Sequence, residues 1–421
     1  MRLAINGGMP ICKIEWPRWP IWIPLAEQMI KEVAYSGRWT IRGGWTGIES
    51  KEYEFSRQFA MYNGVSYCVA TSSGTTGLII SLEALNIGPG DEVIVPSMTW
   101  IAPITAVLSV GAIPVLVDID ITTTCIDPLE IKKAITPHTK AIIVVHLHSA
   151  VSNLGMIMEL VKGKDIFVIE DCSQAHGAIW KNKHVGTVGH VGVFSMNQEK
   201  VLTCGEGGAV ITNDQYVYDR LFRSKTDGCA FDNNRKDKDE DQLIYENVTM
   251  GGNYCMSEFQ AAILISQLEK FDTLNSIRRE NAGYLDEELS KIEGIMPIRQ
   301  YEESTKRTVY EYGVRVDNRY FANKDIDIIC RALSAELGFR LEKTDIPVYR
   351  NKLFDPSTKN RYKFYLEDKR FSQLIPENYP KSELLYNSLI VFHHSVLLAE
   401  RKDMNLIIGA FRKVRDLATT M

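Results

Sequence analysis

The chain has 421 residues, of which 45% are hydrophobic and 24% are charged, and this length predicts two domains rather than a single core. The net charge of -5, with both signs mixed along the chain, gives no electrostatic support for a nucleic-acid partner, and no segment reaches the roughly 18 consecutive apolar residues of a membrane span. The cysteines form no Cys-x-x-Cys pair and the N-terminus has no secretory pattern, so we expect a cytoplasmic protein without a metal site or a disulfide scaffold.

The first fifty residues differ in composition from the rest of the chain. They are rich in Trp and Pro between Trp16 and Trp22, and in Gly between Gly37 and Gly47. A segment of this kind cannot bury an apolar core of its own. We therefore expect residues 1–50 to be an N-terminal segment that packs on the large domain.

From about Tyr67 onward, short apolar runs alternate with helical stretches. The runs cover residues 93–95, 114–117, 141–145 and 166–169. This spacing predicts βαβ units and a mostly parallel sheet between helices, forming a large domain over residues 51–290. Several runs end in polar residues, among them His146 and Asp171, and the carboxyl ends of parallel strands meet at one edge, where ligands bind.

Small and hydroxylic residues occupy the stretch from Ser72 to Thr76, between a predicted strand and a predicted helix. At a helix N-terminus, such residues offer free backbone N–H groups and a positive dipole end, which together suit a phosphate. An ordinary helix N-cap made by Ser73 or Thr75 explains the same pattern.

The stretch from Val168 to Gly177 delivers an acid, Asp171, to the edge of the sheet. A buried carboxylate needs a cation, and a protonated pyridine nitrogen would serve. A helix N-cap by Asp171 is the alternative. His176 alone is more typical of a packed, hydrogen-bonded histidine than of a catalytic one.

Ser195 precedes Lys200 by five residues in a short loop with apolar flanks, and the glycine cluster Gly205–Gly208 follows. The lysine could present an amine to a carbonyl group while the serine holds a phosphate, provided that burial or cationic neighbours lower the lysine pKa. A solvated surface lysine is the ordinary alternative. The glycine cluster does not fit the dinucleotide-binding pattern.

Two later segments complete the chain. The charge run over residues 233–242 has no apolar periodicity, so we interpret it as a solvated loop without a function. After Lys291 the pattern mixes strands and helices, with a clear strand over Tyr310–Val316. We expect a smaller C-terminal α+β domain over residues 291–421.

Taken together and in order, these motifs resemble the sugar aminotransferase family of the DegT/DnrJ type, which consists of fold-type-I enzymes that depend on pyridoxal 5′-phosphate (PLP). The resemblance runs from about Gly37 to His394. The motifs that carry it are Ser72–Thr75, Pro96–Trp100, Glu170–Asp171, Ser195–Lys200 and Gly205–Gly208. Within the family, the L-glutamine:2-deoxy-scyllo-inosose (aminocyclitol) aminotransferases look most similar, notably at Gly251–Phe259 and His393–Leu398.

The resemblance implies roles for individual residues. Lys200 would carry PLP as a Schiff base and move a proton, and Asp171 would pair with the pyridine nitrogen. Trp100 would stack on the ring, and Gln174 would reach its 3′ oxygen. The residues that would hold the phosphate are Ser73, Gly74, Thr75 and Ser195. Asn253 would reach the phosphate of a neighbouring subunit's cofactor, which implies a homodimer with shared active sites.

The activity that the resemblance implies is a ping-pong transfer of an amino group from L-glutamine or L-glutamate to a keto sugar or keto cyclitol, in amino sugar or aminocyclitol biosynthesis of the antibiotic type. Two alternatives remain open. One is a PLP-dependent dehydratase or an aromatising synthase like 3-amino-5-hydroxybenzoate synthase. The other is a non-catalytic PLP-binding regulator.

Three positions depart from the family pattern. Glu199 places a carboxylate directly before the lysine, His148 stands where an aromatic residue is common, and Cys255 stands where many relatives carry arginine. Substrate specificity therefore remains open. The candidate substrate-contacting residues are His146, His148 and His394.

Overall fold

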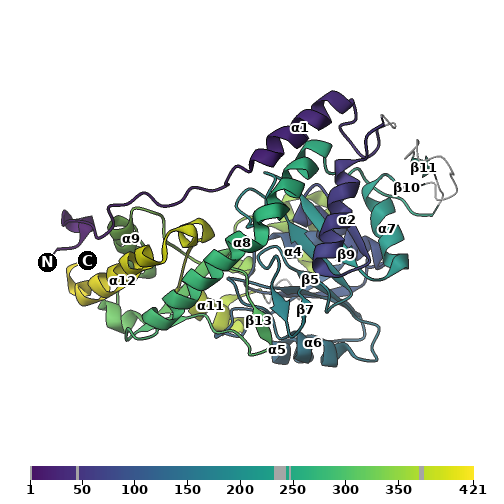
Figure 1. Cartoon of the computed structure of the whole chain (residues 1–421). Coiled ribbons are helices and arrows are strands. Elements are labelled where there is room, and N and C mark those ends of the chain that lie inside the picture. The colour runs from purple at the N-terminus through teal and green to yellow at the C-terminus, as the bar shows by residue number, and fades with distance from the viewer. Residues whose placement is uncertain (1, 44–46, 232–242, 246–247, 369–373) are drawn as a thin grey trace.

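The computed structural model describes residues 2–43, 47–231, 243–245, 248–368 and 374–421 (Figure 1). The charge run over residues 233–242 lies outside the described residues. None of the helices in the described ranges is both long and apolar enough to cross a membrane.

A seven-stranded sheet forms the centre of the molecule. Its strands are β1 (Tyr67–Thr71), β2 (Glu92–Pro96), β3 (Ile113–Val117), β4 (Thr139–Val145), β5 (Phe167–Asp171), β8 (Val191–Ser195) and β9 (Gly208–Thr212). They are ordered β1-β9-β8-β5-β4-β2-β3, and β9 runs antiparallel to both of its neighbours while the other pairs are parallel. The mostly parallel α/β sheet predicted from the spacing of apolar runs is thus confirmed.

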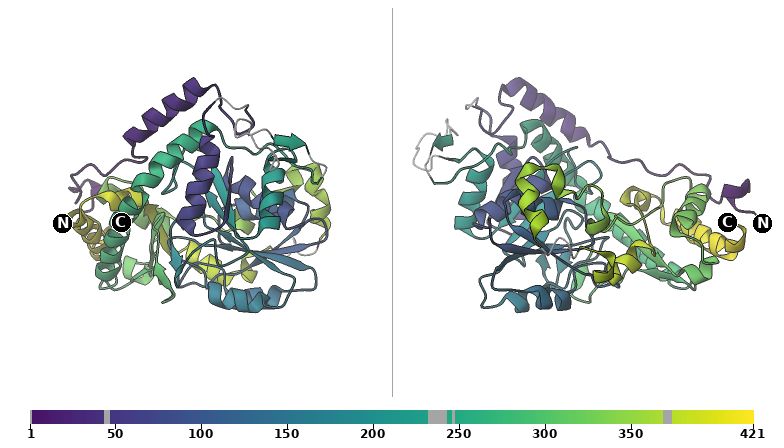
Figure 2. Two further views of the ribbon diagram at one scale, coloured as in Figure 1. Left: turned by 45° about the vertical axis from the view of Figure 1, so that its right-hand side comes forward. Right: turned by 180° about the vertical axis from the view of Figure 1, so that it is seen from behind.

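Helices cover both faces of this sheet (Figure 2). They are α2 (Lys51–Asn63), α3 (Gly74–Ala84), α4 (Ala102–Ser109), α5 (Pro128–Ala134), α6 (Leu154–Val161), α7 (Gln215–Lys225) and α8 (Glu258–Leu289). Strand side chains alternate between two cores: Val93 and Val95 pack in the core that includes α3, α4 and α7, whereas Ile94 packs in the core that includes α2, α5, α6 and α8. This alternation is the period of two expected for a sheet that is buried on both faces.

A second, four-stranded sheet follows the long helix α8. Its strands are β12 (Ile295–Pro297), β14 (Glu311–Val316), β15 (Glu342–Lys343) and β16 (Leu389–His393), in the order β12-β14-β16-β15. The helices α9 (Ile326–Leu337), α11 (Pro380–Tyr386) and α12 (Met404–Asp416) belong to the same part of the chain. A third core includes Leu285 and Leu289 of α8, so α8 contributes to more than one core. The division into residues 51–290 and 291–421 stays a prediction.

Short elements link these parts. The remaining strands are β6 (Ile179–Trp180), β7 (Lys183–His184), β10 (Cys229–Phe231), β11 (Leu243–Tyr245) and β13 (Ser304–Lys306). The 3-10 helices are η1 (Ala4–Asn6), η2 (Asn318–Phe321), η3 (Val348–Arg350), η4 (Pro356–Thr358), η5 (Asn360–Glu367), η6 (Pro376–Asn378), η7 (His394–Leu398), η8 (Arg401–Asp403) and η9 (Ala418–Thr420).

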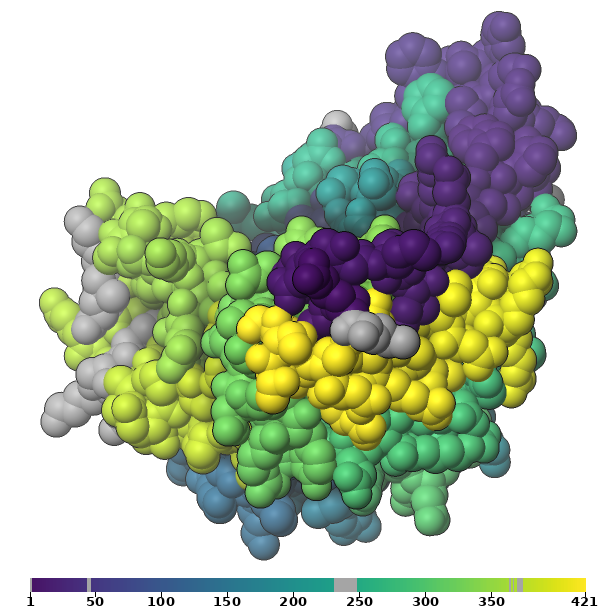
Figure 3. Space-filling view, turned by 90° about the vertical axis from the view of Figure 1, so that its left-hand side faces the viewer, coloured from purple at the N-terminus to yellow at the C-terminus, as the bar shows by residue number. Residues whose placement is uncertain are grey.

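The N-terminal segment does not pack wholly on the large domain, so that expectation is corrected for its first part. Leu3 and Cys12 are buried in the third core, and the Trp16 indole N–H donates to the Leu337 carbonyl at 2.7 Å. Figure 3 shows this segment, in purple, lying over the C-terminal helices, in yellow. The segment then rises to α1 (Pro24–Ser36), which packs along α8. The physical reason is that the indole N–H and the apolar residues find partners on the C-terminal elements.

Candidate active site

A cavity of about 390 Å³ opens at the carboxyl ends of the central strands, facing the second sheet. The predicted site residues that line it are Ser73, Gly74, Thr75, Trp100, Asp171, Gln174, Ser195 and Lys200. Tyr310, Glu311 and Asp345, from the C-terminal part of the chain, line it as well. The fold therefore gathers most of the residues singled out in the sequence around one cavity.

The N-terminus of α3 forms one end of this cavity. Ser73 is the N-cap: its hydroxyl accepts a hydrogen bond from Thr76 N–H at 3.1 Å, and its own N–H donates to Thr76 Oγ1 at 3.0 Å. The N–H groups of Gly74 and Thr75 have no acceptor within the described ranges and stand at the positive end of the helix. The N-cap is confirmed, and it leaves room for an anion at the same helix end.

Gly74 makes this end of the cavity compact. A Cβ atom added at position 74 would lie 2.9 Å from Ser195 Cβ, which is closer than such atoms come in proteins. The start of α3 and the end of β8 can therefore approach each other only with glycine here. This places the Ser195 hydroxyl beside the free N–H groups of α3.

Asp171 is the last residue of β5 and is 5% exposed. Burial raises the pKa of its carboxyl group, while hydrogen bonds from Ser173 and the charges of Lys200 and His146 oppose the rise. The Ser173 N–H donates to Asp171 Oδ1 at 3.1 Å. The alternative reading of Asp171 as a helix N-cap is wrong, because a turn and β6 follow it rather than a helix.

Lys200 lies inside the cavity, and burial lowers the pKa of its amine against the raising effect of Glu311, Asp171 and Asp345. Its Nζ is 3.7 Å from the centre of the Tyr310 ring. Within the described part of the chain the Nζ makes neither a hydrogen bond nor an ion pair. A lysine in this setting is a nucleophile and a base rather than a surface cation.

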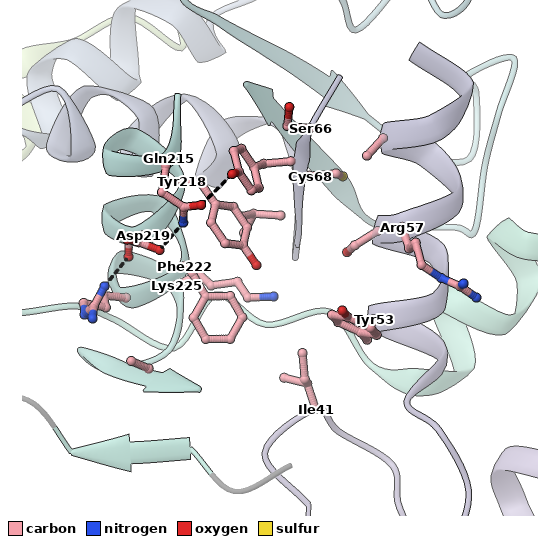
Figure 4. A pocket seen from close by; sticks show the side chains of 16 residues that line it. Ile41, Tyr53, Arg57, Ser66, Cys68, Gln215, Tyr218, Asp219, Phe222 and Lys225 are labelled. Atoms are coloured by element: carbon pink, nitrogen blue, oxygen red, sulfur yellow. Dashed lines mark hydrogen bonds between the residues drawn. The ribbon is translucent and has the colours of Figure 1, made fainter. Parts of the chain in front are cut away.

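A larger hollow of about 650 Å³ lies between α2, β1 and α7 (Figure 4). Lys225, which projects into it, is already occupied: it forms an ion pair with Glu52 and donates to the Ala70 carbonyl at 3.0 Å. Tyr67 and Tyr218 stack on each other at its wall. Because its lysine is neutralised by a carboxylate, this hollow lacks the free amine that distinguishes the cavity around Lys200.

The backbone of the lysine loop is held from two sides. Nε2–H groups of His393 and His394 both donate to the Glu199 carbonyl, at 3.1 and 2.9 Å, and the Trp19 indole donates to the Gln198 carbonyl at 2.9 Å. The Glu199 carboxylate is 55% exposed and lies beside His393 rather than in the cavity. His394, a predicted substrate contact, thus touches the lysine loop and does not line the cavity.

His146, the first of the predicted substrate contacts, is also outside the cavity wall. Its Nε2 is hydrogen-bonded to Glu170 Oε2 at 3.1 Å and its Nδ1 accepts from Ser152 N–H at 3.1 Å, so both ring nitrogens are used. Glu170 in turn accepts from the N–H groups of Gly186, Val188 and Gly189. Although Cys172 completes a group of possible metal ligands here, this carboxylate is already satisfied by backbone donors.

His148 links the predicted cofactor residues to the C-terminal part of the chain. Its N–H donates to Gln174 Oε1 at 2.9 Å, its Nδ1 is 3.1 Å from Glu311 Oε2, and its Nε2 is 2.6 Å from Thr344 Oγ1. No sequence pattern singles out Glu311 or Asp345, apart from the position of Glu311 near the start of the predicted strand over Tyr310–Val316.

Asn253 is exposed and does not line the cavity of its own chain. It pairs with Thr226 in an isolated bridge, and its Oδ1 accepts from Cys255 N–H at 3.4 Å. His176 is packed, as expected: it is fully buried against Phe194, and burial lowers its pKa to about 3. The expected hydrogen bonds are absent, because neither ring nitrogen has a hydrogen-bond partner among the described residues.

Comparison with known proteins gives a consistent picture. A model described as the DegT/DnrJ/EryC1/StrS aminotransferase family matches residues 27–375. The L-glutamine:2-deoxy-scyllo-inosose aminotransferase of Streptoalloteichus tenebrarius is 41% identical over 416 residues, covering 98% of this chain and 97% of that protein.

Two solved structures resemble the whole fold. A 3-amino-5-hydroxybenzoic acid synthase has a TM-score of 0.80 at 26% identity, covering 95% of this chain and 99% of its own. DesV of S. venezuelae, in complex with a ketimine intermediate, has a TM-score of 0.76 at 28% identity, covering 93% of this chain and 94% of its own.

Proposed function

Because the chain belongs to the DegT/DnrJ/EryC1/StrS aminotransferase family and is a PLP-dependent aminotransferase, we propose that it transfers the amino group of L-glutamine to a keto cyclitol. The observation that carries the proposal is the partly buried amine of Lys200, which faces a cavity also lined by Asp171 and makes no hydrogen bond or ion pair with the described residues. The named activity of the 41% identical relative supports both the donor and the acceptor class. We place the reaction in aminocyclitol biosynthesis of the antibiotic type.

The residues of the cavity fit PLP. When bound, PLP supplies an electron sink that stabilises negative charge on the substrate carbon next to nitrogen. Lys200 would bind its aldehyde carbon, Asp171 would keep its pyridine nitrogen protonated, and the α3 N-terminus with Ser195 would hold its phosphate. The raised pKa of Asp171 agrees with a carboxylate that awaits a buried cation.

Lys200 would act as the base of both half-reactions. Its lowered pKa favours the neutral amine, which can remove a proton from the donor Cα and later return one to the carbon that becomes the product amine centre. The donor leaves as a keto acid before the acceptor enters, so we expect ping-pong kinetics. The hydrogen bonds to the Gln198 and Glu199 carbonyls would keep the loop of this base in place.

A homodimer with shared active sites is part of the proposal. Asn253 is exposed at the surface of its own chain, which suits a residue that reaches the phosphate site of a second subunit. A cytoplasmic location also stays a prediction, and the eight unpaired cysteines support it.

Isotope transfer tests the proposed donor and acceptor directly. The purified enzyme with PLP would be incubated with L-glutamine labelled with ¹⁵N at the α-amino group and with 2-deoxy-scyllo-inosose. We expect mass spectrometry to detect an aminocyclitol one mass unit heavier than the product from unlabelled glutamine. Label that reaches the cofactor but not the ketone would refute the acceptor, whereas label that never leaves glutamine, even for the cofactor, would refute the donor.

A further inference from the structure

The cavity has an acidic wall, which we define as Glu311 and Asp345. Glu311 begins β14 and Asp345 follows β15, so both come from the second sheet, whereas Asp171 and the α3 N-terminus come from the central one. Both acids line the same cavity as Lys200, and their negative charges raise the pKa of its amine. They therefore face the part of the cavity where the amine is transferred. Neither acid takes part in the proposed proton transfer by Lys200.

Glu311 is held in a fixed orientation. His148 Nδ1 is 3.1 Å from its Oε2, and the Ser149 hydroxyl donates to its backbone carbonyl at 2.7 Å. His148 and Ser149 have positive φ angles of 49° and 71°, a backbone conformation that is costly for residues other than glycine. Although burial opposes ionisation, the hydrogen bond and charge of His148 hold the pKa of Glu311 below its usual value. Glu311 is therefore an ionised, oriented acceptor.

Asp345 forms no hydrogen bond or ion pair with any of the residues that the structure describes. Neither of its oxygens makes a hydrogen bond within the described ranges, and the same is true of Glu311 Oε1. Burial and the neighbouring Glu311 raise the pKa of Asp345 to about 6. Asp345 is half-buried and lines the cavity, so hydrogen-bond donors of a ligand there can reach its oxygens. The free oxygens of the acidic wall thus leave acceptor positions that the protein itself does not fill.

The charge of the cavity restricts what can fill these positions. Lys200 is the only cation among the described wall residues, while the carboxylates there are Asp171, Glu206, Glu311 and Asp345. A substrate that carries a diphosphate or another anionic group would meet like charges beside the acidic wall. A neutral ring with several hydroxyl groups would instead supply O–H donors to the free oxygens.

On this basis we propose that Glu311, positioned by His148, and Asp345 determine acceptor specificity by accepting hydrogen bonds from hydroxyl groups of a free, uncharged polyhydroxy cyclic ketone. The inference rests on the proposed function, since it concerns the second half-reaction of the same site. Glu311 and Asp345 would contact the acceptor, and His148 would act only through Glu311.

The two half-reactions can be measured apart, which separates this inference from the proposed function. In stopped-flow experiments, the PLP-loaded enzyme is mixed with L-glutamine alone, and the aminated enzyme is then mixed with 2-deoxy-scyllo-inosose. For Glu311→Gln and Asp345→Asn we expect the acceptor step to lose about tenfold or more in kcat/KM, mainly through KM, because a charge-assisted hydrogen bond is weakened. The donor step should change by less than about threefold.

Glu287→Gln is the matched control, because Glu287 is 67% exposed, is paired with Lys291 and does not line the cavity. It should leave both steps unchanged. His148→Leu should raise the acceptor KM as Glu311→Gln does, and His148→Gln, which can still donate to Glu311, should restore part of the loss. A merely structural role of His148 would instead lower cofactor loading in both variants.

Acceptor analogues locate the contacts. A cyclohexanone that lacks the hydroxyl recognised by Asp345 should be used equally well by wild type and Asp345→Asn. The effects of removing the hydroxyl from the acceptor and the carboxylate from the enzyme should therefore not be additive. Acceptor KM values within twofold of wild type in both acid variants, or an equal loss in the donor step, would overturn the inference. A wild-type enzyme that fails already with L-glutamine would instead refute the proposed donor.

Discussion

At the residue scale, Asp171 shows why burial matters to the chemistry of this site. Its carboxyl group has a raised pKa because burial outweighs the help from Ser173, Lys200 and His146. A protonated pyridine nitrogen would supply the missing positive charge and in turn be kept protonated by the carboxylate. In the proposed mechanism, the residue would therefore stabilise the cofactor form that withdraws electrons, without contacting the substrate.

Asp171→Asn tests this role. The amide keeps the shape but cannot hold a protonated nitrogen, so we expect kcat to fall at least about a hundredfold while the protein remains folded. Single-turnover absorbance with L-glutamine measures the effect. Asp165→Asn, at a residue that is 76% exposed and paired with Lys140, is the control and should be silent. Near-normal turnover of Asp171→Asn would argue against the assignment.

Asp345 gives a pH prediction. Its pKa is raised to about 6, so it is mostly protonated at pH 5 and mostly ionised at pH 7. Because only the ionised form is a strong acceptor, kcat/KM for the acceptor should fall about tenfold from pH 7 to pH 5. The pKa of Asp345 also depends on the charges of its neighbours, which are Glu311, His148, Lys200 and Glu342. The pH profile of the wild type must therefore be compared with that of Asp345→Asn. In Asp345→Asn, the fall in kcat/KM centred near pH 6 should be absent. The same fall in the variant as in the wild type would contradict the prediction.

At the scale of elements, the sequence predicted the sheet and one side of the site well. Apolar runs marked the strands, and the polar residue that ends β5 marked the sheet edge, because strand ends in a parallel sheet share one edge. The capping pattern at Ser73 likewise located the start of α3. These signals are local, so they can be read along the chain.

The other side of the site could not be predicted in the same way. Asp345 is far from Lys200 in sequence and reaches the cavity only because the second sheet folds back onto the central one. His146 and His394 carried a family signal for the site, yet His146 is hydrogen-bonded to Glu170 and Ser152, and the Nε2–H of His394 donates to the Glu199 carbonyl. The N-terminal segment was misplaced because its partners, such as the Leu337 carbonyl, lie more than three hundred residues away.

Replacement of Gly74 tests how closely α3 must approach β8, and replacement of Gly283 serves as its control. Gly74→Ala would place a Cβ atom 2.9 Å from Ser195 Cβ, so it should weaken PLP binding by about 1–3 kcal/mol through overpacking at the predicted phosphate site. Gly283→Ala in α8 is the control, since nothing lies within 4 Å of the added atom and alanine favours a helix by about 0.5–1 kcal/mol. Titration with PLP and thermal melts measure both variants. Unaltered PLP affinity in Gly74→Ala would show that α3 does not hold the phosphate.

At the scale of the whole molecule, distant parts of the chain converge on the lysine loop. Trp19 of the N-terminal segment holds the Gln198 carbonyl, and His393 at the end of β16 and His394 at the start of η7 hold the Glu199 carbonyl. The central sheet supplies the residues that fit the cofactor, and the second sheet supplies the acidic wall. The exposed Asn253 would add a contribution from a second subunit.

A mixing experiment tests the shared active site. Lys200→Ala and Asn253→Ala should each be strongly impaired as homodimers. After unfolding and refolding together, a mixed dimer regains one intact site, so total activity should return to about a quarter of wild type, by the symmetry of a two-fold dimer. If Asn253 serves only its own chain, the mixture will show no more than the average of the two separate variants.

The central claim is that the chain is a glutamine-dependent aminotransferase in which Lys200 binds PLP covalently and acts as the base. The visible absorption spectrum of the PLP-loaded protein, recorded before and after addition of L-glutamine without any acceptor, tests this claim most directly. We predict that the band of the lysine-bound cofactor bleaches as 2-oxoglutaramate forms, and that Lys200→Ala shows neither the band nor the keto acid. An unchanged band in the wild-type protein would contradict the glutamine-dependent reaction, and a bleaching Lys200→Ala variant would contradict the role of the lysine.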